Sequence, residues 1–415
     1  MAKIIITGMG IVSAIGNNAD ETLIALQAQK SGIAPLHYLN TSHDEFPVGE
    51  IKMSNEEMIH LLNISENEPT TRTSLMGMLA VREALKNAGL LNPANEGTCF
   101  QNLEGLNVAF INGTTVGGMD KSEQFYLDFL ENDTKNAYIS THDCGTCTEM
   151  IADYFGIFSQ VDTISTACSS AANAIVLGAE LLKSGRADIV VAGGAECITK
   201  FHLNGFNTLM ILDKEPCRPF DATRAGLNLG EGAAYIIMET EEHFNTRCHC
   251  GHEPQSPLIT ISGYANTCDA FHQTASSPDG EGAYLAMKKA LEDANLKPSD
   301  IDYINAHGTG TGNNDLSEGT AIMRLFGEQI PPVSSTKSFT GHTTSAAGCV
   351  EAVISILALQ HNFVPANLNF SEKMPELAFV PENTDNVHSN TYLRCVLTNS
   401  FGFGGNDTSL IFSKF

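Results

Sequence analysis

One cysteine and two histidines in this chain stand where side chains of their type can do chemistry. Cys168 lies between a β-type run, VDTIS, and a helical stretch rich in Ala and Leu. A thiol at a helix N-terminus faces exposed N–H groups, which favour the nucleophilic thiolate. His307 and His342 each lie in a glycine turn, a place that faces a cleft in α/β proteins. These residue types predict a nucleophilic thiol that a substrate carbonyl can approach, and two histidines able to donate hydrogen bonds to one developing oxyanion or enolate.

Each of these residues also has a simpler interpretation. Most of the 11 cysteines in such a chain are expected to be buried structural residues. Either histidine taken alone is at least as easily explained by a structural role. The C-terminal sequence NSFGFGGND predicts a tight turn whose N–H groups form an anion nest, or else a turn without function.

The elements that must position these side chains alternate between short β-branched runs and helical stretches, which is typical of an α/β protein with helix-covered sheets. Helices are expected over 170–184 and 282–294. A polar connector, 246–257, divides the chain into residues 1–255, which carry the cysteine, and residues 256–415, which carry both histidines. Each half opens with a strand that runs into a glycine turn, so a duplicated α/β unit is plausible. Strands are expected at IIIT, NVAFING, ADIVVAGG, LITISGY, DYINAHG and RCVLTNS, with a further one leading into DTISTACSS.

Composition excludes several classes of function. The 415 residues include 23 Lys and Arg against 48 Asp and Glu, a formal charge of −25, which disfavours nucleic-acid and membrane-surface binding. The apolar runs are shorter than the ~20 residues that span a bilayer, so no transmembrane helix is predicted. The start of the chain lacks the features of a secretory signal, and the odd, scattered cysteines do not suggest a disulfide framework. We therefore expect a cytoplasmic protein with mostly reduced cysteines.

Seven sequence motifs occur in one order along the chain. They are KIIITGMGIVSAIG at 3–16, NGTTVGGMD at 112–120, TACSSAANAI at 166–175, CRPFDATRAGLNLGEGAA at 217–234, NAHGTGTGNND at 305–315, KSFTGHTTSAAGCVEA at 337–352 and NSFGFGG at 399–405. In this order and spacing the chain resembles the β-ketoacyl-[acyl-carrier-protein] synthases, the elongating type II members of the thiolase-like superfamily. The resemblance covers nearly the whole chain.

The resemblance implies a thiolase-like fold, with two similar α/β halves stacked in αβαβα layers, each built on a five-stranded mixed sheet. It implies a 3-oxoacyl-[acyl-carrier-protein] synthase, in which Cys168 takes an acyl group from acyl carrier protein. Malonyl carrier protein would then lose CO2 and extend that chain by two carbons. The protein itself would need no cofactor or metal, because the phosphopantetheine arm arrives on the carrier protein. The protein would form a homodimer, or a heterodimer with a related synthase.

The same resemblance assigns roles to single residues. His307 and His342 would stabilise the enolate as neutral donors, Lys337 would organise charge around His307, and Glu351 would hold Lys337. The remaining assignments are the backbone N–H groups of Cys168 and Phe403 as the oxyanion hole, Thr309 and Thr311 for the pantetheine arm, Val116 and Phe206 for the acyl pocket, and Phe403 for its gate.

The chain departs from the common family pattern at Asn173, at 227–228 and at 406–407. Leu227 and Asn228 are expected near the acyl chain, which leaves the substrate open. Fatty acid synthesis, and aryl polyene, pigment or type II polyketide assembly, are alternatives with the same chemistry. A non-catalytic partner resembling the chain-length factors is a third, disfavoured by the retained cysteine, histidines and lysine.

Docking to an acidic carrier protein needs basic residues, and this chain has few. Its early matching region offers Arg72 alone, and Lys200 and Lys214 are further candidates, so weak and salt-sensitive binding is expected. Two groups resemble metal ligands superficially: Cys144 with Cys147, and Cys248-His249-Cys250 with His252. Neither has the regular pairs of a structural zinc site, so no metal is expected.

Overall fold

In the described residues, ten strands form one continuous hydrogen-bonded sheet made of two five-stranded halves, called here the first and the second sheet, which join where β1 pairs with β6. The computed structural model describes residues 3–65, 68–91, 103, 105–132, 138–248, 257–384 and 392–414. The strand order within this part of the chain is β3-β2-β4-β5-β1-β6-β10-β9-β7-β8, and β1 joins β6 through a short antiparallel pairing of residues 4–6 with 259–261. The strands are β1 Ile4–Ser13, β2 Val108–Gly113, β3 Gln160–Ile164, β4 Ile189–Glu196, β5 Gly232–Thr240, β6 Ile259–Cys268, β7 Tyr303–Asn305, β8 Val333–Ser334, β9 Cys395–Gly402 and β10 Asn406–Lys414.

The two sheets have the same pairing pattern. In the first, β2 pairs in parallel with β3 and β4, and β5 pairs antiparallel with β4 and β1. In the second, β7 pairs in parallel with β8 and β9, and β10 pairs antiparallel with β9 and β6. The predicted pair of similar five-stranded halves is therefore confirmed. The expected boundary at 255/256 lies outside the described residues.

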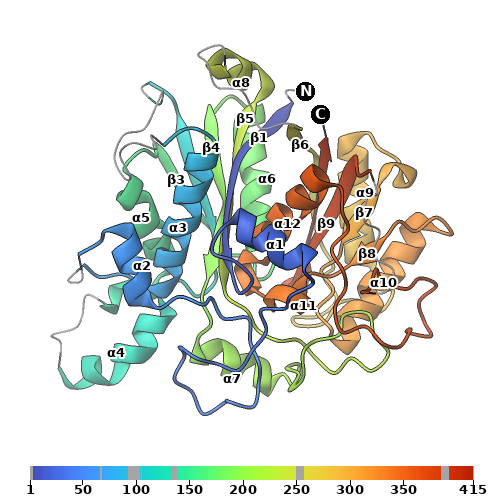
Figure 1. The fold of residues 1–415 in the computed structure, drawn as a ribbon, viewed down its shortest axis with the longest axis horizontal. Helices are drawn as coiled ribbons and strands as arrows, with labels where there is room; N and C mark the ends of the chain where they lie inside the picture. Colours follow the sequence, from blue (N-terminus) through green and yellow to red (C-terminus); the bar gives the residue numbers. More distant parts are fainter. Residues whose placement is uncertain are drawn as a thin grey trace.

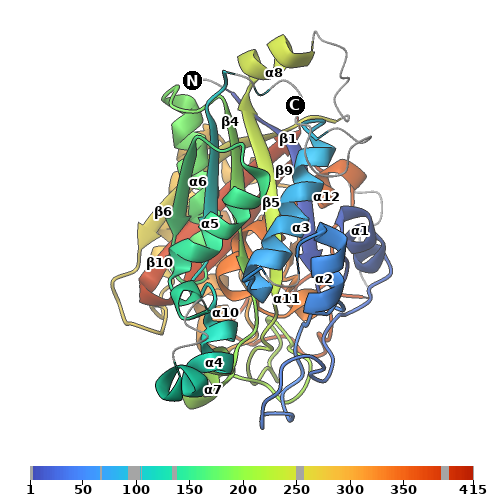
Figure 2. The same ribbon diagram turned by 90° about the vertical axis from the view of Figure 1, so that its left-hand side faces the viewer.

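Helices cover both sheets and fill the space between them. Helices α6 and α12 lie in the centre, α3 and α5 cover the outer face of the first sheet, and α9 and α10 cover the outer face of the second (Figures 1 and 2). One apolar core cluster lies around the central helices and one lies on each outer side, which gives the αβαβα layers. The helices are α1 Ala19–Gln27, α2 Asn55–Leu62, α3 Arg72–Asn87, α4 Met119–Glu131, α5 Cys144–Phe155, α6 Ser170–Lys183, α7 Lys200–Thr208, α8 Glu241–Cys248, α9 Glu281–Ala294, α10 Gly312–Phe326, α11 Lys337–Thr340 and α12 Ala347–His361.

The expected strands and helices are present with small shifts of their ends. The two-residue strand β8 is additional to the six runs and the strand before Cys168 that the sequence predicted, and so are the longer strands β5 and β10. Both are central in their sheets, and β5 is buried along nearly all its length, so its apolar run GAAYIIMET lacks the alternation of a half-exposed strand.

The central helix α12 is unusually apolar. A window at Thr344–His361 has the length and mean hydropathy of a membrane span, and 89% of it is buried inside the fold. It packs between the two sheets, against α6 and β5.

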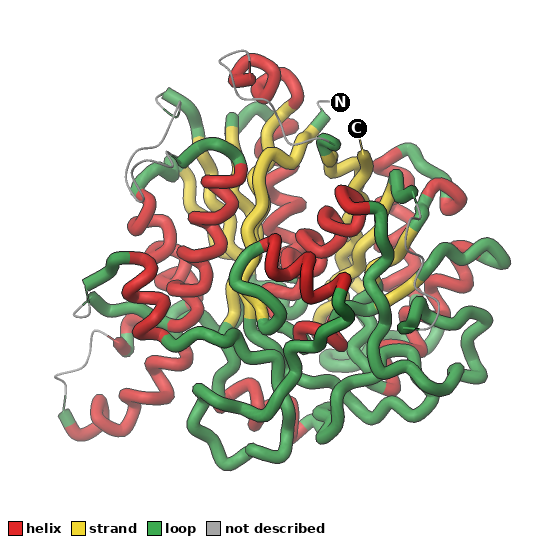
Figure 3. Tube along the Cα trace, viewed as in Figure 1, coloured by secondary structure: helices red, strands yellow, loops and turns green. Residues whose placement is uncertain are grey.

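Six of the eight described cysteines that are free are also buried, as expected. Long loops gather at one end of the molecule, below the sheets in Figure 3.

Candidate active site

The predicted nucleophile lies in a tight turn between β3 and α6, which we call the nucleophile turn (residues 166–169). Ala167 has a φ of 52°, a strained conformation for a residue with a Cβ. The turn is held by Ser170, whose Oγ accepts from Thr166 N (2.9 Å) and donates to Ala167 O (2.6 Å). Cys168 itself is 6% exposed. Local hydrogen bonds therefore fix a strained turn that presents the thiol at the start of α6.

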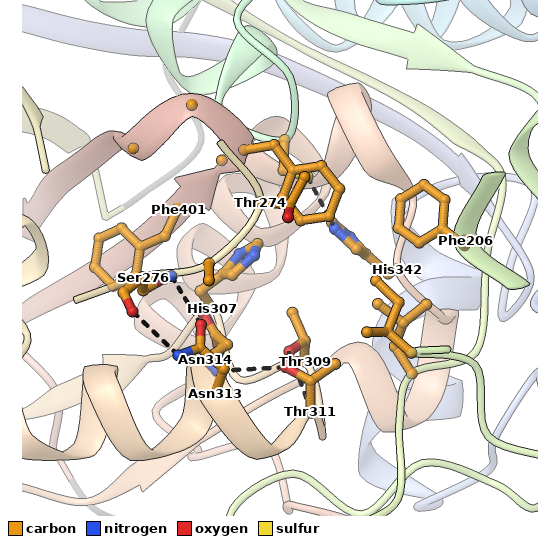
Figure 4. A pocket seen from close by; sticks show the side chains of 18 of the residues that line it. Phe206, Thr274, Ser276, His307, Thr309, Thr311, Asn313, Asn314, His342 and Phe401 are labelled. Atoms are coloured by element: carbon orange, nitrogen blue, oxygen red, sulfur yellow. Dashed lines mark hydrogen bonds between the residues drawn. The ribbon is translucent and has the colours of Figure 1, made fainter. Parts of the chain in front are cut away.

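Both predicted histidines reach this thiol from the other half of the chain. His342 Nε2 lies 3.1 Å from Cys168 Sγ. The rings of His307 and His342 lie 5.2 Å apart and nearly perpendicular, at 84°, and both side chains face the same pocket (Figure 4). The ammonium of Lys337 donates to His307 Nδ1 at 3.2 Å. Because Nδ1 accepts this bond, a neutral His307 carries its proton on Nε2.

Burial sets the charge of these groups. Desolvation, reinforced by the nearby Lys337 charge, lowers the pKa of both His307 and His342 well below the usual range, so both rings are neutral. Lys337 is buried and forms an ion pair with Glu351, which is also buried. Burial raises the pKa of Glu351 to about 7, although Lys337 opposes this. Two neutral donors beside a buried ion pair fit the role expected of the histidines.

The expectation that Cys168 is a ready thiolate is not supported by the structure. Burial raises the pKa of the Cys168 thiol to about 11, against the lowering by Lys337 and by the N–H groups of Phe403 and Cys168 itself. The helix N-terminus is present as predicted, but desolvation of the anion outweighs it. The resting residue is a thiol, beside the neutral His342.

The predicted glycine turn joins β9 to β10 and lies against the nucleophile. We call residues 402–406 the glycine hairpin. A Cβ on Gly402 would lie 3.2 Å from Cys168 N and 3.1 Å from Thr166 O, so this close approach favours glycine. Gly404 has a φ of 81°. The Phe403 N–H acts on the Cys168 sulfur, as noted above, so N–H groups from both halves meet at this atom.

Two cavities meet at Cys168. The first, of about 140 Å³, is lined by both histidines and by Thr309 and Thr311, whose hydroxyls are 2.8 Å apart (Figure 4). The second, of about 580 Å³, is mostly apolar. A cavity that carries hydroxyl and imidazole groups, which we call the entrance cavity, and a more apolar chamber at the same sulfur suit a substrate with a polar arm and an acyl chain.

The apolar chamber contains the predicted acyl-pocket residues. Val116 and Phe206 line it together with Phe403. Phe206 and Phe403 also line the entrance cavity, and their rings stack with centroids 5.8 Å apart and planes at 22°. This stacked pair stands between the two cavities, where a gate would be.

Two buried carboxylates that hold the site were missed from the sequence. Glu318 accepts from the backbone N–H groups of His307 (2.9 Å) and Gly308 (2.7 Å). Asp315 accepts from Gly310 N at 3.1 Å. Their i, i+3 spacing places both on one face of α10, beside buried residues such as Ile322. Acidic residues on the apolar face of a helix were the signal that could have found them.

The departures at 227–228 do not reach the apolar chamber. Leu227 lines the entrance cavity instead. Asn228 is buried, accepts from Cys217 N (2.7 Å) and donates to Asp213 O (3.2 Å), while its own carbonyl accepts from His342 N (2.7 Å). It therefore organises a loop and the backbone of His342, and the expectation that it lies beside the acyl chain is wrong.

Arg72 is not a docking residue. It is 8% exposed, and its guanidinium donates to both carboxylate oxygens of Glu231 and to the carbonyls of Met53 and Ile51. Because these hydrogen bonds occupy its guanidinium, the Arg72 side chain is not available to bind a carrier protein. Lys200 and Lys214 are exposed and remain candidates.

The described residues contain no cluster of three or more His, Cys, Asp or Glu side chains arranged to hold a metal ion. Within that part of the chain, Cys144 lies at the start of α5 and donates to Thr115 O at 2.9 Å, while Cys147 is buried. The second group, from Cys248 to His252, lies outside the residues whose side chains the structure describes.

The αβαβα layers, the thiol and the two neutral histidines define a condensing acyltransferase of the thiolase-like superfamily. Two family descriptions match the sequence: "Beta-ketoacyl synthase, N-terminal domain" over residues 1–243, and "Beta-ketoacyl synthase, C-terminal domain" over residues 258–371. The chain belongs to the beta-ketoacyl synthase family.

Relatives of this family align with the chain from end to end. Nodulation protein E of Rhizobium meliloti (strain 1021) is 32% identical over 99% of both chains. The 3-oxoacyl-[acyl-carrier-protein] synthase 2 of Coxiella burnetii is 32% identical over 99% of this chain and 98% of its own.

Solved structures agree with this fold. The ishigamide ketosynthase/chain length factor superposes with a TM-score of 0.87 at 28% identity, covering 100% of this chain and 99% of its own. A ketosynthase from Xenorhabdus doucetiae, in complex with its chain length factor, superposes with a TM-score of 0.84 at 29% identity, covering 100% and 98%.

Proposed function

We propose that the protein is a 3-oxoacyl-[acyl-carrier-protein] synthase that extends an acyl chain by two carbons in fatty acid biosynthesis. The observation that carries this proposal is the meeting of Cys168, His307 and His342 where the entrance cavity, lined by the histidines and two threonines, joins the apolar chamber. The relatives named 3-oxoacyl-[acyl-carrier-protein] synthase 2 support the same reaction.

The first half-reaction transfers the acyl group. The Cys168 sulfur forms a bond to the acyl carbon, the bond to the pantetheine sulfur breaks, and the Cys168 proton leaves with the pantetheine thiol. The N–H groups of Cys168 and Phe403 stabilise the oxyanion of this step, and the acyl chain enters the chamber lined by Val116 and Phe206. Thr309 and Thr311 hold the pantetheine arm in the entrance.

The second half-reaction forms the carbon–carbon bond. The malonyl group loses CO2, and the electron pair of the broken bond moves into an enolate whose oxygen accepts from His307 and His342. The carbanion then attacks the acyl carbon on Cys168, and the C–S bond breaks to release the 3-oxoacyl product. Its electron pair leaves with the Cys168 sulfur as a thiolate, which takes up a proton from water to restore the thiol. Lys337 and Glu351 keep His307 oriented and uncharged.

The partners belong to this proposal as well. Acyl carrier protein brings both substrates, so the protein needs no cofactor or metal of its own. The similar ketosynthase solved with a chain length factor supports pairing with a related subunit, and a homodimer is the alternative. The proposed location is the cytoplasm.

The same chemistry in polyene, pigment or polyketide assembly is the second candidate, favoured by the ketosynthase/chain length factor structures. Product mass spectrometry tests both. The purified protein is incubated with malonyl carrier protein and a panel of saturated and polyunsaturated acyl carrier proteins, with Cys168→Ala as control. A 3-oxoacyl product two carbons longer that is lost in the variant supports the synthase, and the best primer separates the pathways. No condensation with any primer would favour a non-catalytic partner subunit.

A further inference from the structure

A polar network joins the nucleophile turn of the first half to the glycine hairpin of the second. At its centre, Asn173 of α6 donates through Nδ2 to Thr166 Oγ1 (2.9 Å) in the nucleophile turn and to Asn406 Oδ1 (3.2 Å) in the glycine hairpin. The same Nδ2 lies 3.4 Å from Ser169 Oγ. Asn173 Oδ1 accepts from Thr408 on β10 at 2.8 Å. Asn173 and Asn406 are 233 residues apart in the sequence.

The two ends of this network carry the two oxyanion donors. One donor is the N–H of Cys168, in the nucleophile turn. The other is the N–H of Phe403, in the hairpin whose stem pairs Gly402 with Asn406. Gly402 packs against Cys168 N, as its close approach shows. The separation of the two donors therefore depends on how the hairpin stem lies against the turn, and no covalent bond fixes this.

We propose that Asn173 and Asn406 form a positioning pair that holds the Phe403 N–H at oxyanion distance from the Cys168 N–H. This inference rests on the proposed function, because it needs an acyl transfer that develops an oxyanion at Cys168. Both asparagines are partly buried and lie at positions where the chain departs from the common pattern. The side chains at these two positions contact each other, so one hydrogen bond between them explains both departures from the pattern.

The network also supplies a matched control. Asn266 of β6 donates to Asn406 Oδ1 (2.7 Å) and Thr408 Oγ1 (2.8 Å), the two hairpin-side partners of Asn173, but has no hydrogen bond of its own to the nucleophile turn among the described residues. Its replacement by alanine removes hydrogen bonds of the same kind from the same hairpin, but removes neither of the Asn173 hydrogen bonds to Thr166 and Asn406.

The test compares Asn173→Ala, Asn406→Ala and their double variant with Asn266→Ala, by the single-turnover rate of acyl transfer to Cys168. Removing an oxyanion donor costs about 10²- to 10³-fold, so a displaced donor is expected to cost roughly 10-fold in each single variant. The double variant should be no more than about 3-fold slower than either one, because the two act through one contact. Asn266→Ala should stay within about 2-fold of the wild type. Asn173→Asp, which keeps the acceptor for Thr408, serves if the alanine variant does not fold.

A second measurement distinguishes positioning from general damage. Alkylation of Cys168 by iodoacetamide forms no oxyanion, so in the variants that slow acyl transfer its rate should fall much less, by no more than the weaker stabilisation of the thiolate by the Phe403 N–H. Any of three results would overturn the proposal. Alkylation could fall as much as acyl transfer, the two single effects could multiply in the double variant, or the variants could have rates like that of Asn266→Ala. A wild-type protein that forms no acyl-enzyme would instead contradict the proposed function.

Discussion

The loop after β2 and the loop after β7 occupy equivalent places in the two halves, and each is held by a buried carboxylate. In the first half, Glu196 accepts from the backbone N–H groups of Thr115 (2.7 Å) and Val116 (3.2 Å). In the second, Glu318 does the same for His307 and Gly308. One loop shapes the apolar chamber and the other carries a proposed catalytic histidine. The duplicated scaffold thus offers two rigid loops, and the residue types decide which does chemistry.

The two central helices make a similar comparison. A non-glycine residue with positive φ precedes each: Ala167 (52°) before α6 and Thr344 (46°) before α12. Cys168 follows the first strained residue, while His342 lies just ahead of the second. The two side chains meet at 3.1 Å because the helices pack together in the middle layer. The first half therefore supplies the proposed nucleophile and the second half supplies the proposed hydrogen-bond donors, so we expect their two tasks to be separable by mutation.

Substitution of one residue in each half should separate the two half-reactions, and this is the largest effect that we expect. Cys168→Ala should lower condensation at least ~10³-fold, because no thioester forms, while malonyl decarboxylation persists. His307→Ala should keep acyl transfer but lower decarboxylation roughly 10²-fold, because one enolate donor is lost. Acyl-enzyme mass and CO2 release measure the two steps. Loss of both steps in both variants would contradict separable tasks.

The pH dependence of Cys168 alkylation tests whether burial between the halves outweighs the helix N-terminus. With a pKa of about 11, the thiolate fraction rises as pH rises. The rate should therefore increase about tenfold per pH unit from pH 7 to 9. Iodoacetamide labelling is followed on the Cys168 peptide, with the exposed Cys268 as the comparison thiol. A plateau below pH 9 would mean that an ion pair with His342 already holds a thiolate.

Glu318 and Glu196 should give different kinetic losses when glutamine replaces each one, which exchanges a carboxylate oxygen for an amide nitrogen. Glu318→Gln is expected to lower kcat about 10- to 30-fold, because the His307 loop loses a charge-assisted hydrogen bond. Glu196→Gln should mainly change the KM for the acyl substrate, since its loop lines the chamber. Steady-state kinetics with two primers of different length measure both. Equal losses of kcat in the two variants would mean that the loops are not specialised.

Val116→Phe should shorten the preferred acyl chain, because a phenyl ring fills part of the chamber. We expect roughly a 10-fold shift in the ratio of kcat/KM between a short and a long primer. Val380→Phe is a matched control, because Val380 is 42% exposed and does not line the chamber. An unchanged primer preference would place the acyl chain elsewhere.

The smallest effect concerns docking of the carrier protein. Lys214 is exposed and lies three residues after Ile211, which lines the entrance cavity. Lys214→Ala should raise the KM for carrier protein about 3-fold at low salt and less at high salt, because screening weakens the same attraction. Lys289→Ala, an exposed lysine of α9, is the control. A KM that is flat with salt would argue against an electrostatic patch.

Several features of this protein follow from the sequence alone. The order of the motifs indicated the family, and local patterns placed Cys168 at the start of a helix and divided the chain into two similar halves. These are short-range properties: strand runs, glycine turns and helix starts depend on neighbouring residues.

Only the tertiary structure decided the rest, because burial and long-range contacts depend on how distant segments pack. Packing of the two halves made Cys168 a protonated thiol rather than the expected thiolate, and it turned Arg72 from a docking candidate into the buried partner of Glu231. It also brought Asn173 to Asn406 across the chain. A charge or amide in a sequence does not reveal its desolvation or its partner, since both are set by residues far away along the chain.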